Sequence, residues 1–138
     1  LAKNDWSIGF VSTSSITHAT PASFYSHVSS RLMQQEIAKD LVNSDVDFIA
    51  GGGYNWFINR TDSLNYFDSL EQKGFFVDTN SVLTPTDKNQ DKLAFLLSPD
   101  GMQAKHLGRD NFLTDATTRA IEFLDNKTEP FFLMIEGG

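Results

Sequence analysis

Residues 130–138 read PFFLMIEGG, an unbroken apolar run from Phe131 to Ile135 directly before Glu136. A strand that is apolar at every position, and not only at every second one, is typical of a strand covered on both faces. Sheets covered on both faces are mostly parallel, because the helices that connect parallel strands lie on those faces. This stretch therefore predicts an α/β protein.

Other short apolar runs alternate with segments of helical spacing along the chain. They predict further strands at residues 8–11, 47–50, 75–77 and 92–97. Helices are predicted from Pro21 onward and at residues 32–42, 63–73 and 113–126. Polar loops are predicted at 12–17 and 98–110. This order predicts a doubly wound α/β fold with a mainly parallel sheet, formed as a single domain over residues 1–138.

Local signals mark several ends of these elements. Thr20-Pro21 has the pattern of an N-cap followed by proline at the first helical position, and Gly74 is placed to end the helix before it. The triplet Gly51–Gly53 is expected to end a strand in a tight turn with a close approach of the backbone. No lysine followed by serine or threonine comes after it, so the triplet does not complete a phosphate-binding loop.

Composition narrows the possible functions. The net charge of −7 disfavours nucleic acid or an anionic membrane as a partner, because the summed field repels polyanions. The absence of cysteine excludes disulfides and thiolate metal sites. No run approaches the roughly 18 apolar residues of a membrane span. The chain opens on Leu1 without a signal-peptide pattern and stops after an apolar run, so we expect it to be a piece of a longer protein.

Polar residues follow three of the predicted strands. In doubly wound sheets, ligands bind beyond the carboxyl ends of the strands. The segment from His18 to Thr20, the glycines 51–53 and Glu136 all fall at such ends. These three features therefore lie where a ligand site would be expected.

Each of these residues also has a plain structural interpretation. His18 can be an ordinary loop histidine, Thr20 only a helix cap, and Arg31 a solvated surface charge. Glu136 is harder to explain in this way, because a partly buried carboxylate needs a partner or a metal. We interpret His27 and His106 as structural. The residue pattern alone leaves these alternatives open.

Two longer motifs favour the functional interpretation of these residues. The run VSTSSITHATPASFYSHVSSR, residues 11–31, resembles a signature stretch of the alkaline phosphatases, and PFFLMIEGG resembles the strand of that family that carries a metal-binding glutamate. DFIAGGG, GFFVDTNS and LTDATTRAIEFLDNK are weaker matches to the region between them, and they follow in the same order. The resemblance thus covers nearly the whole chain.

The resemblance implies roles for four residues. His18, Thr20 and Glu136 match the positions that surround the third metal of the family, normally Mg²⁺, and Arg31 matches the arginine that holds the substrate phosphate. An arginine suits this task, because its planar fork makes two parallel charge-assisted hydrogen bonds to an anion. Mg²⁺ prefers oxygen ligands, whereas the imidazole of His18 better suits zinc, cobalt or nickel. The identity of the metal therefore stays open.

One geometric conflict has to be resolved by the fold. If a straight helix ran from Thr20 to Arg31, the two residues would lie about 16 Å apart along its axis. They would then not share a compact site. The resemblance therefore requires a helix that is short, broken, or oriented so that the arginine reaches back.

The resemblance also implies what this chain lacks. The family carries its nucleophilic serine upstream of this region, and its Zn²⁺ ligands both upstream and downstream. We therefore expect hydrolysis of phosphate monoesters by the full-length protein, with both Mg²⁺ and Zn²⁺, and no activity from this chain alone. Two alternatives remain: another hydrolase of the metal-dependent phosphatase and sulfatase group, and a non-catalytic α/β binding domain.

The resemblance implies a place and an assembly as well. The full-length protein is expected to be periplasmic or extracellular. In the family, a strand that this chain lacks lies inside the sheet, so an interior strand should be left with an unpaired edge. We therefore expect a homo-oligomer.

Overall fold

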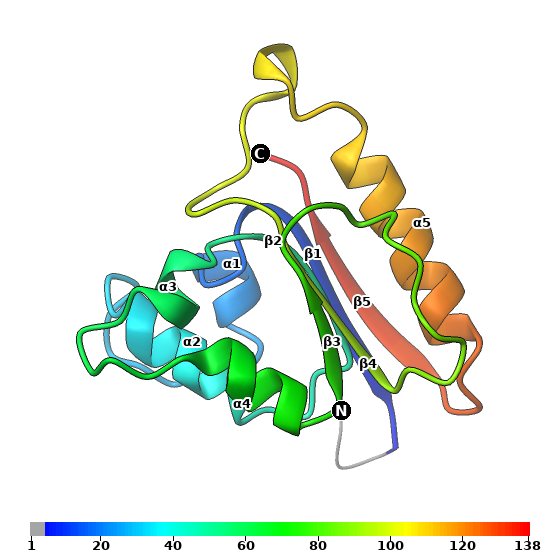
Figure 1. The fold of residues 1–138 in the computed structure, drawn as a ribbon, viewed down its shortest axis with the longest axis horizontal. Coiled ribbons are helices and arrows are strands. Elements are labelled where there is room, and N and C mark those ends of the chain that lie inside the picture. The colour runs from blue at the N-terminus through cyan, green and yellow to red at the C-terminus, as the bar shows by residue number, and fades with distance from the viewer. Residues whose placement is uncertain (1–4) are drawn as a thin grey trace.

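The computed structural model describes residues 5–138, which form one five-stranded parallel sheet covered by helices (Figure 1). The strands lie in the order β3-β4-β2-β1-β5, and every neighbouring pair is parallel. Their bounds are β1 Ser7–Ser15, β2 Phe48–Gly52, β3 Phe75–Asp78, β4 Lys92–Leu96 and β5 Phe131–Glu136. The predicted fold class is confirmed.

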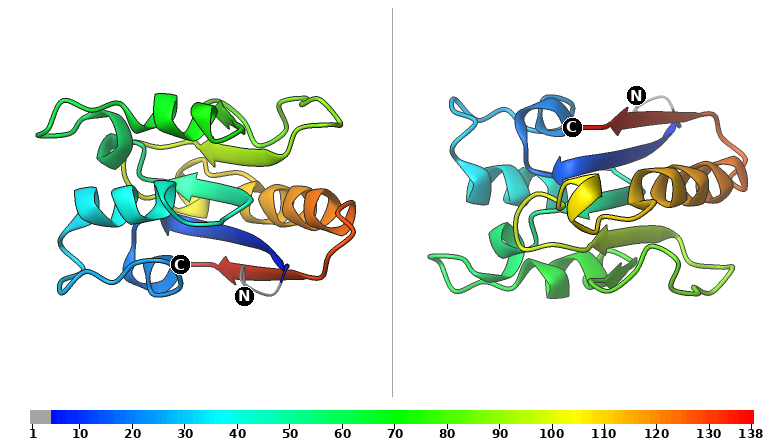
Figure 2. Two further views of the ribbon diagram at one scale, coloured as in Figure 1. Left: turned by 90° about the horizontal axis from the view of Figure 1, so that it is seen from below. Right: turned by 90° about the horizontal axis from the view of Figure 1, so that it is seen from above.

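The helices cover both faces of this sheet. The long helix α5 lies alone on one face, and the shorter helices lie on the other, as Figure 2 shows from two sides. Their bounds are α1 Ala19–Ala22, α2 Gln34–Val42, α3 Asn55–Ile58, α4 Tyr66–Gln72 and α5 Phe112–Asp125, with a short 3-10 turn, η2, at Lys105–Leu107. Within residues 5–138, no helix combines the length and apolar character that crossing a membrane requires.

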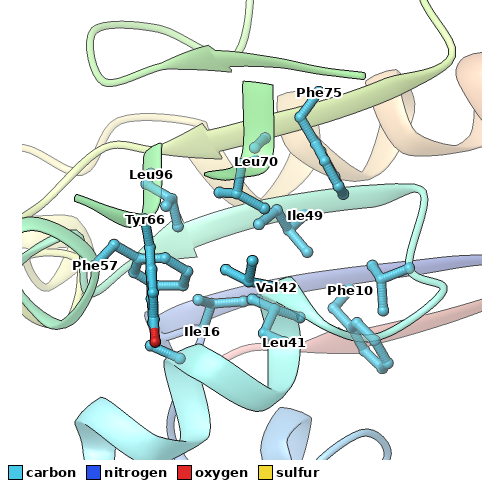
Figure 3. Packing of buried hydrophobic residues seen from close by; sticks show 13 residues of the cluster. Phe10, Ile16, Leu41, Val42, Ile49, Phe57, Tyr66, Leu70, Phe75 and Leu96 are labelled. Atoms are coloured by element: carbon cyan, nitrogen blue, oxygen red, sulfur yellow. The ribbon is translucent and has the colours of Figure 1, made fainter. Parts of the chain in front are cut away.

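Successive side chains of each inner strand pack alternately into two hydrophobic cores, one on each face of the sheet. Phe10 and Ile49 face the short helices, whereas Val11 and Phe48 pack against α5. Figure 3 shows the first cluster, in which Leu41 of α2 lies with these strand residues. Because each strand buries both of its faces, its sequence is apolar at successive positions.

Several boundaries differ from those expected. The strand β1 continues through Ser15, where a polar loop from residue 12 was expected, and β2 takes in Gly51 and Gly52. The helix α3 was not expected at all. The helix α4 begins at Tyr66 and not near Ser63, because the side chain of Asn65 accepts a hydrogen bond from the N–H of Phe67 and so caps the helix.

The expected role of Thr20 as an N-cap is wrong. The N-cap of α1 is His18, without a side-chain cap, so Pro21 occupies the third helical position and not the first. Proline is tolerated there, because the first N–H groups of a helix have no intrahelical acceptor. The side chain of Thr20 is exposed and its hydroxyl is not used to cap the helix.

The glycine triplet permits a close approach of the backbone, as the sequence predicts. A Cβ on Gly52 would lie 1.8 Å from the carbonyl oxygen of Asp100, and one on Gly53 would lie 2.1 Å from Oγ of Ser15. Gly53 also has a φ of +98°, which favours glycine. The triplet therefore lets the end of β1 and the turn around Asp100 pack against the end of β2.

Candidate functional site

The carboxyl ends of β1 and β5 meet at the candidate site. In the parallel register of the two strands, Ser12 is paired with Glu136. The chain leaves β1 after Ser15 and reaches α1 within three residues, which places His18 and Thr20 at the same end of the sheet. Figure 1 shows β1 and β5 running side by side toward this end.

Glu136 is held by hydroxyl groups. Ser12 Oγ donates a hydrogen bond of 2.9 Å to Oε2 of Glu136, and Ser14 Oγ lies 3.3 Å from the same oxygen. Burial alone would raise the pKa of Glu136. Hydrogen bonds from Thr20, Ser12 and Ser14, together with the charge of His18, outweigh burial and hold this pKa below its usual range. The side chain is therefore a carboxylate at neutral pH, with Thr20 beside it.

His18 contacts Arg31 near this carboxylate. Its Nε2 lies 3.3 Å from Nη2 of Arg31, although 13 residues separate the two in sequence. Its Nδ1 is buried and has no hydrogen-bond partner among the described residues. Because Arg31 can only donate, Nε2 accepts and Nδ1 carries the ring proton, which has no acceptor among the described residues.

A folded-back segment brings Arg31 to His18. The helix α1 has only four residues, and the chain then turns between Ser23 and Met33 before α2 begins. Tyr25 anchors this segment, because its hydroxyl donates a hydrogen bond of 2.6 Å to the carbonyl of Ile16. The distance conflict raised by a straight helix is thus removed by a short helix.

The other two histidines lie outside this group. His27 is exposed, and its backbone N–H donates to Asp40. His106 is exposed in η2. Within residues 5–138, no three residues of the types His, Cys, Asp and Glu come together as a metal cage. The site therefore offers one carboxylate and one imidazole, with hydroxyl groups around them.

Sequence reasoning missed the two serines that hold Glu136. The sequence predicts a loop at Ser12 and Ser14, because small polar residues are typical of loops. Their spacing of two residues directly after an apolar run was the available signal, since residues i and i+2 of a strand share a face.

The comparisons with known proteins agree on one family. The family model of alkaline phosphatase matches residues 2–138. The chain belongs to the alkaline phosphatase family. It is 38% identical to alkaline phosphatase 4 of Bacillus subtilis over 141 aligned residues, which cover 95% of this chain and 30% of that protein. It is 28% identical to the human tissue-nonspecific isozyme, covering 96% of this chain and 33% of that protein.

Solved alkaline phosphatases share the fold. The enzyme of the Antarctic bacterium TAB5 superimposes with a TM-score of 0.92 at 44% identity, over 99% of this chain and 40% of its own. Two variants of the TAB5 enzyme, with a histidine replaced by aspartate or glutamate, have Mg bound in the M3 site. The cold-active Shewanella enzyme gives a TM-score of 0.86 at 27% identity, over 99% of this chain and 33% of its own. The chain thus spans well under half of these alkaline phosphatases.

Proposed function

We propose that the protein to which this chain belongs hydrolyses phosphate monoesters. In this proposal the chain supplies the phosphate-binding Arg31 and part of a divalent metal site, formed by His18, Thr20 and Glu136. The observation that carries the proposal is the contact between Arg31 and His18 at 3.3 Å, beside a carboxylate that stays ionised. The family match favours this function over a sulfatase-type hydrolase or a binding domain without activity.

Arg31 is suited to bind the substrate phosphate. Its side chain is exposed, and its one described hydrogen bond uses Nη2 toward His18. The guanidinium carries five N–H donors in a fixed plane, so further donors remain for an anion. Two parallel charge-assisted hydrogen bonds would then fix both the position and the orientation of a phosphate group. In this arrangement His18 orients the guanidinium.

The residues beside Arg31 fit a divalent cation. The carboxylate of Glu136 is a metal donor and the Thr20 hydroxyl adjoins it, while the Nδ1–H of His18 can donate to a water on the cation, because Nε2 accepts from Arg31. We propose Mg²⁺ as the cation, which the Mg-bound variants of the TAB5 enzyme support. A bound cation supplies positive charge that stabilises anionic phosphate oxygens. Further ligands, and those for Zn²⁺, would come from outside this chain.

The decisive experiment replaces Arg31 in the whole protein. For Arg31→Ala, we expect the inhibition constant for inorganic phosphate to rise about tenfold to a hundredfold, because the lost charge-assisted hydrogen bonds contribute about 1.5–3 kcal/mol. Arg31→Lys should recover only part of the affinity, since a lysine keeps the charge but not the fork. The measurement is competitive inhibition by phosphate of p-nitrophenyl phosphate hydrolysis.

Lys88→Ala is the matched control. It also removes one positive charge, from an exposed side chain in the loop that precedes β4 at the opposite end of the sheet. Phosphate inhibition should be unchanged in this variant. If Arg31→Ala lowers the melting temperature and leaves phosphate inhibition unchanged, Arg31 has a structural role and the proposal is wrong.

A further inference from the structure

The hydroxyl of Ser12 lies at the centre of a small hydrogen-bond network. Ser12 is fully buried, and its Oγ lies 2.9 Å from Oε2 of Glu136. The same Oγ lies 2.8 Å from Oγ of Ser14 and accepts the backbone N–H of Ser14 at 3.1 Å. Three polar groups therefore converge on one serine oxygen.

The number of protons in this network indicates which groups donate and which accept. A serine hydroxyl has one proton to donate and two lone pairs to accept with. The N–H of Ser14 fills one lone pair of Ser12, and the hydroxyl of Ser14 is shared between Oγ of Ser12 at 2.8 Å and Oε2 of Glu136 at 3.3 Å. The proton of Ser12 then goes to the carboxylate of Glu136, which accepts only.

The backbone around the two serines is fixed by close packing. The register between β1 and β2 shifts between Val11 and Ser15, on either side of this network. A Cβ on Gly51 of β2 would lie 2.9 Å from the carbonyl oxygen of Ser12 and 3.3 Å from that of Ser14. Because these neighbours are backbone atoms, they have little freedom to move. Both serines are thus held in place from the side of β2.

We propose that Ser12, oriented by Ser14, is a positioning residue for the carboxylate of Glu136. The serine holds Oε2, so that Oε1 is the oxygen presented to the divalent cation. The inference rests on the proposed function, because it assumes that Glu136 is a metal ligand. Groups that orient a metal ligand before binding strengthen the affinity, since the ligand then needs no further ordering.

The network predicts a graded effect of substitutions. Ser12→Ala removes the donor to Glu136. Ser14→Ala removes one of the two groups that orient Ser12 and the longer, 3.3 Å contact to Glu136, but the backbone N–H of residue 14 remains. Ser14→Ala should therefore weaken cation binding less than Ser12→Ala does. Ser12→Thr keeps the hydroxyl and should restore most of the affinity.

The experiment is a calorimetric titration of the metal-stripped whole protein with Mg²⁺, which measures the dissociation constant. For Ser12→Ala we expect the dissociation constant to rise about tenfold to a hundredfold, the usual effect of removing a group that orients a metal ligand. The rise in melting temperature on addition of Mg²⁺ should shrink in parallel. An unchanged dissociation constant for Ser12→Ala would overturn the proposal.

Ser7→Ala is the matched control at the other end of the same strand. Ser7 is also buried, and its Oγ donates a hydrogen bond of 3.0 Å to Oε1 of Glu129, just before β5. Its loss should lower the melting temperature of the metal-free protein without changing the Mg²⁺ dissociation constant. If Ser7→Ala weakens Mg²⁺ binding as much as Ser12→Ala does, the effect is general destabilisation and the positioning role is wrong.

The variant Glu136→Gln distinguishes failure of the proposed metal site from failure of the proposed role of Ser12. If this variant loses Mg²⁺ affinity while Ser12→Ala keeps it, the metal site stands and the role of Ser12 fails. If Glu136→Gln keeps full Mg²⁺ affinity, the proposed metal site itself fails. Loss of affinity in both variants, with Ser12→Thr close to the unsubstituted protein, supports both.

Discussion

The buried cation Arg60 connects the short helices α2, α3 and α4. Its side chain is 1% exposed, and Nη1 donates to the backbone carbonyls of Gln35 at 2.7 Å and Trp56 at 3.1 Å. Its other nitrogens form a forked pair with Asp62, and the guanidinium lies 4.0 Å from the centre of the Tyr66 ring. Four of the five N–H groups thus have an acceptor and the ring of Tyr66 lies against the guanidinium, which compensates the burial of its charge.

We predict that Arg60→Ala destabilises the fold strongly. It removes the hydrogen bonds of a buried guanidinium to two backbone carbonyls and to Asp62, together with the ring contact, so the free energy of unfolding should fall by about 2–4 kcal/mol. Lys39→Ala is the control, because Lys39 forms an ion pair with Glu36 in which both side chains are about half exposed. Its effect should stay below about 1 kcal/mol. Urea unfolding measures both, and equal effects would contradict the buried role of Arg60.

Residue type predicted the importance of Glu136 from the sequence, but not that of Arg60 and Ser12. Glu136 was expected to matter because a carboxylate after a buried strand is conspicuous. Arg60 was passed over, because it lies in a polar stretch and two of its acceptors are backbone carbonyls that no sequence pattern reveals. Ser12 was missed because a small hydroxyl residue is equally common in loops. Long-range contacts, and not residue type, decide these cases.

At the scale of elements, the strands were predicted better than the short helices. Every expected strand is present, because continuous apolar runs mark strands buried on both faces. The helix α3 has four residues, Asn55–Ile58, too few to show a helical period. The strand β2 includes Gly51 and Gly52, although glycine has a low propensity for strands. Backbone atoms lie so close to both residues that a side chain would not fit, and this explains why glycine occupies these positions.

The segment between α1 and α2 depends on Tyr25. Its hydroxyl donates to the buried carbonyl of Ile16, next to the loop that carries His18. Burial, with a smaller contribution from the charge of Asp40, raises the pKa of Tyr25 well above its usual value of 10.0. The folded protein therefore keeps a proton that the unfolded chain releases above about pH 10. The stability that this tyrosine contributes is complete below pH 10 and is lost as the pH rises further.

We predict that Tyr25→Phe changes how stability depends on alkaline pH. At pH 8 the variant should be less stable by about 1 kcal/mol, because one hydrogen bond is missing. Above pH 10 the free energy of unfolding of the unsubstituted protein should fall by about 1.4 kcal/mol per pH unit through Tyr25, and the variant lacks this loss. The difference in stability between the two proteins should therefore disappear. The measurement is the urea unfolding midpoint from pH 8 to 11, with Tyr54→Phe as the control. A constant difference over this range would contradict the raised pKa.

At the scale of the whole molecule, β5 is an edge strand with the sequence of an interior one. Its only neighbour in the described sheet is β1. Residues 131–134 are half-buried, Ile135 is 46% exposed, and the 52% exposed Phe24 packs 5.3 Å from Phe132. Unpaired backbone groups beside exposed apolar side chains are a template for pairing with another strand. The chain covers 30% of the B. subtilis relative and 40% of the TAB5 enzyme.

We predict that the 138-residue chain, prepared alone, forms dimers or larger assemblies through the edge of β5. Ile135→Lys should shift it toward monomer, because a lysine on an edge strand opposes pairing. Ile121→Lys is the control, since Ile121 is 44% exposed on α5 and Ile135 is 46% exposed on β5. Light scattering at increasing protein concentration measures the mass. A monomer at every concentration, or the same mass for both lysine variants, would show that the edge of β5 does not drive association.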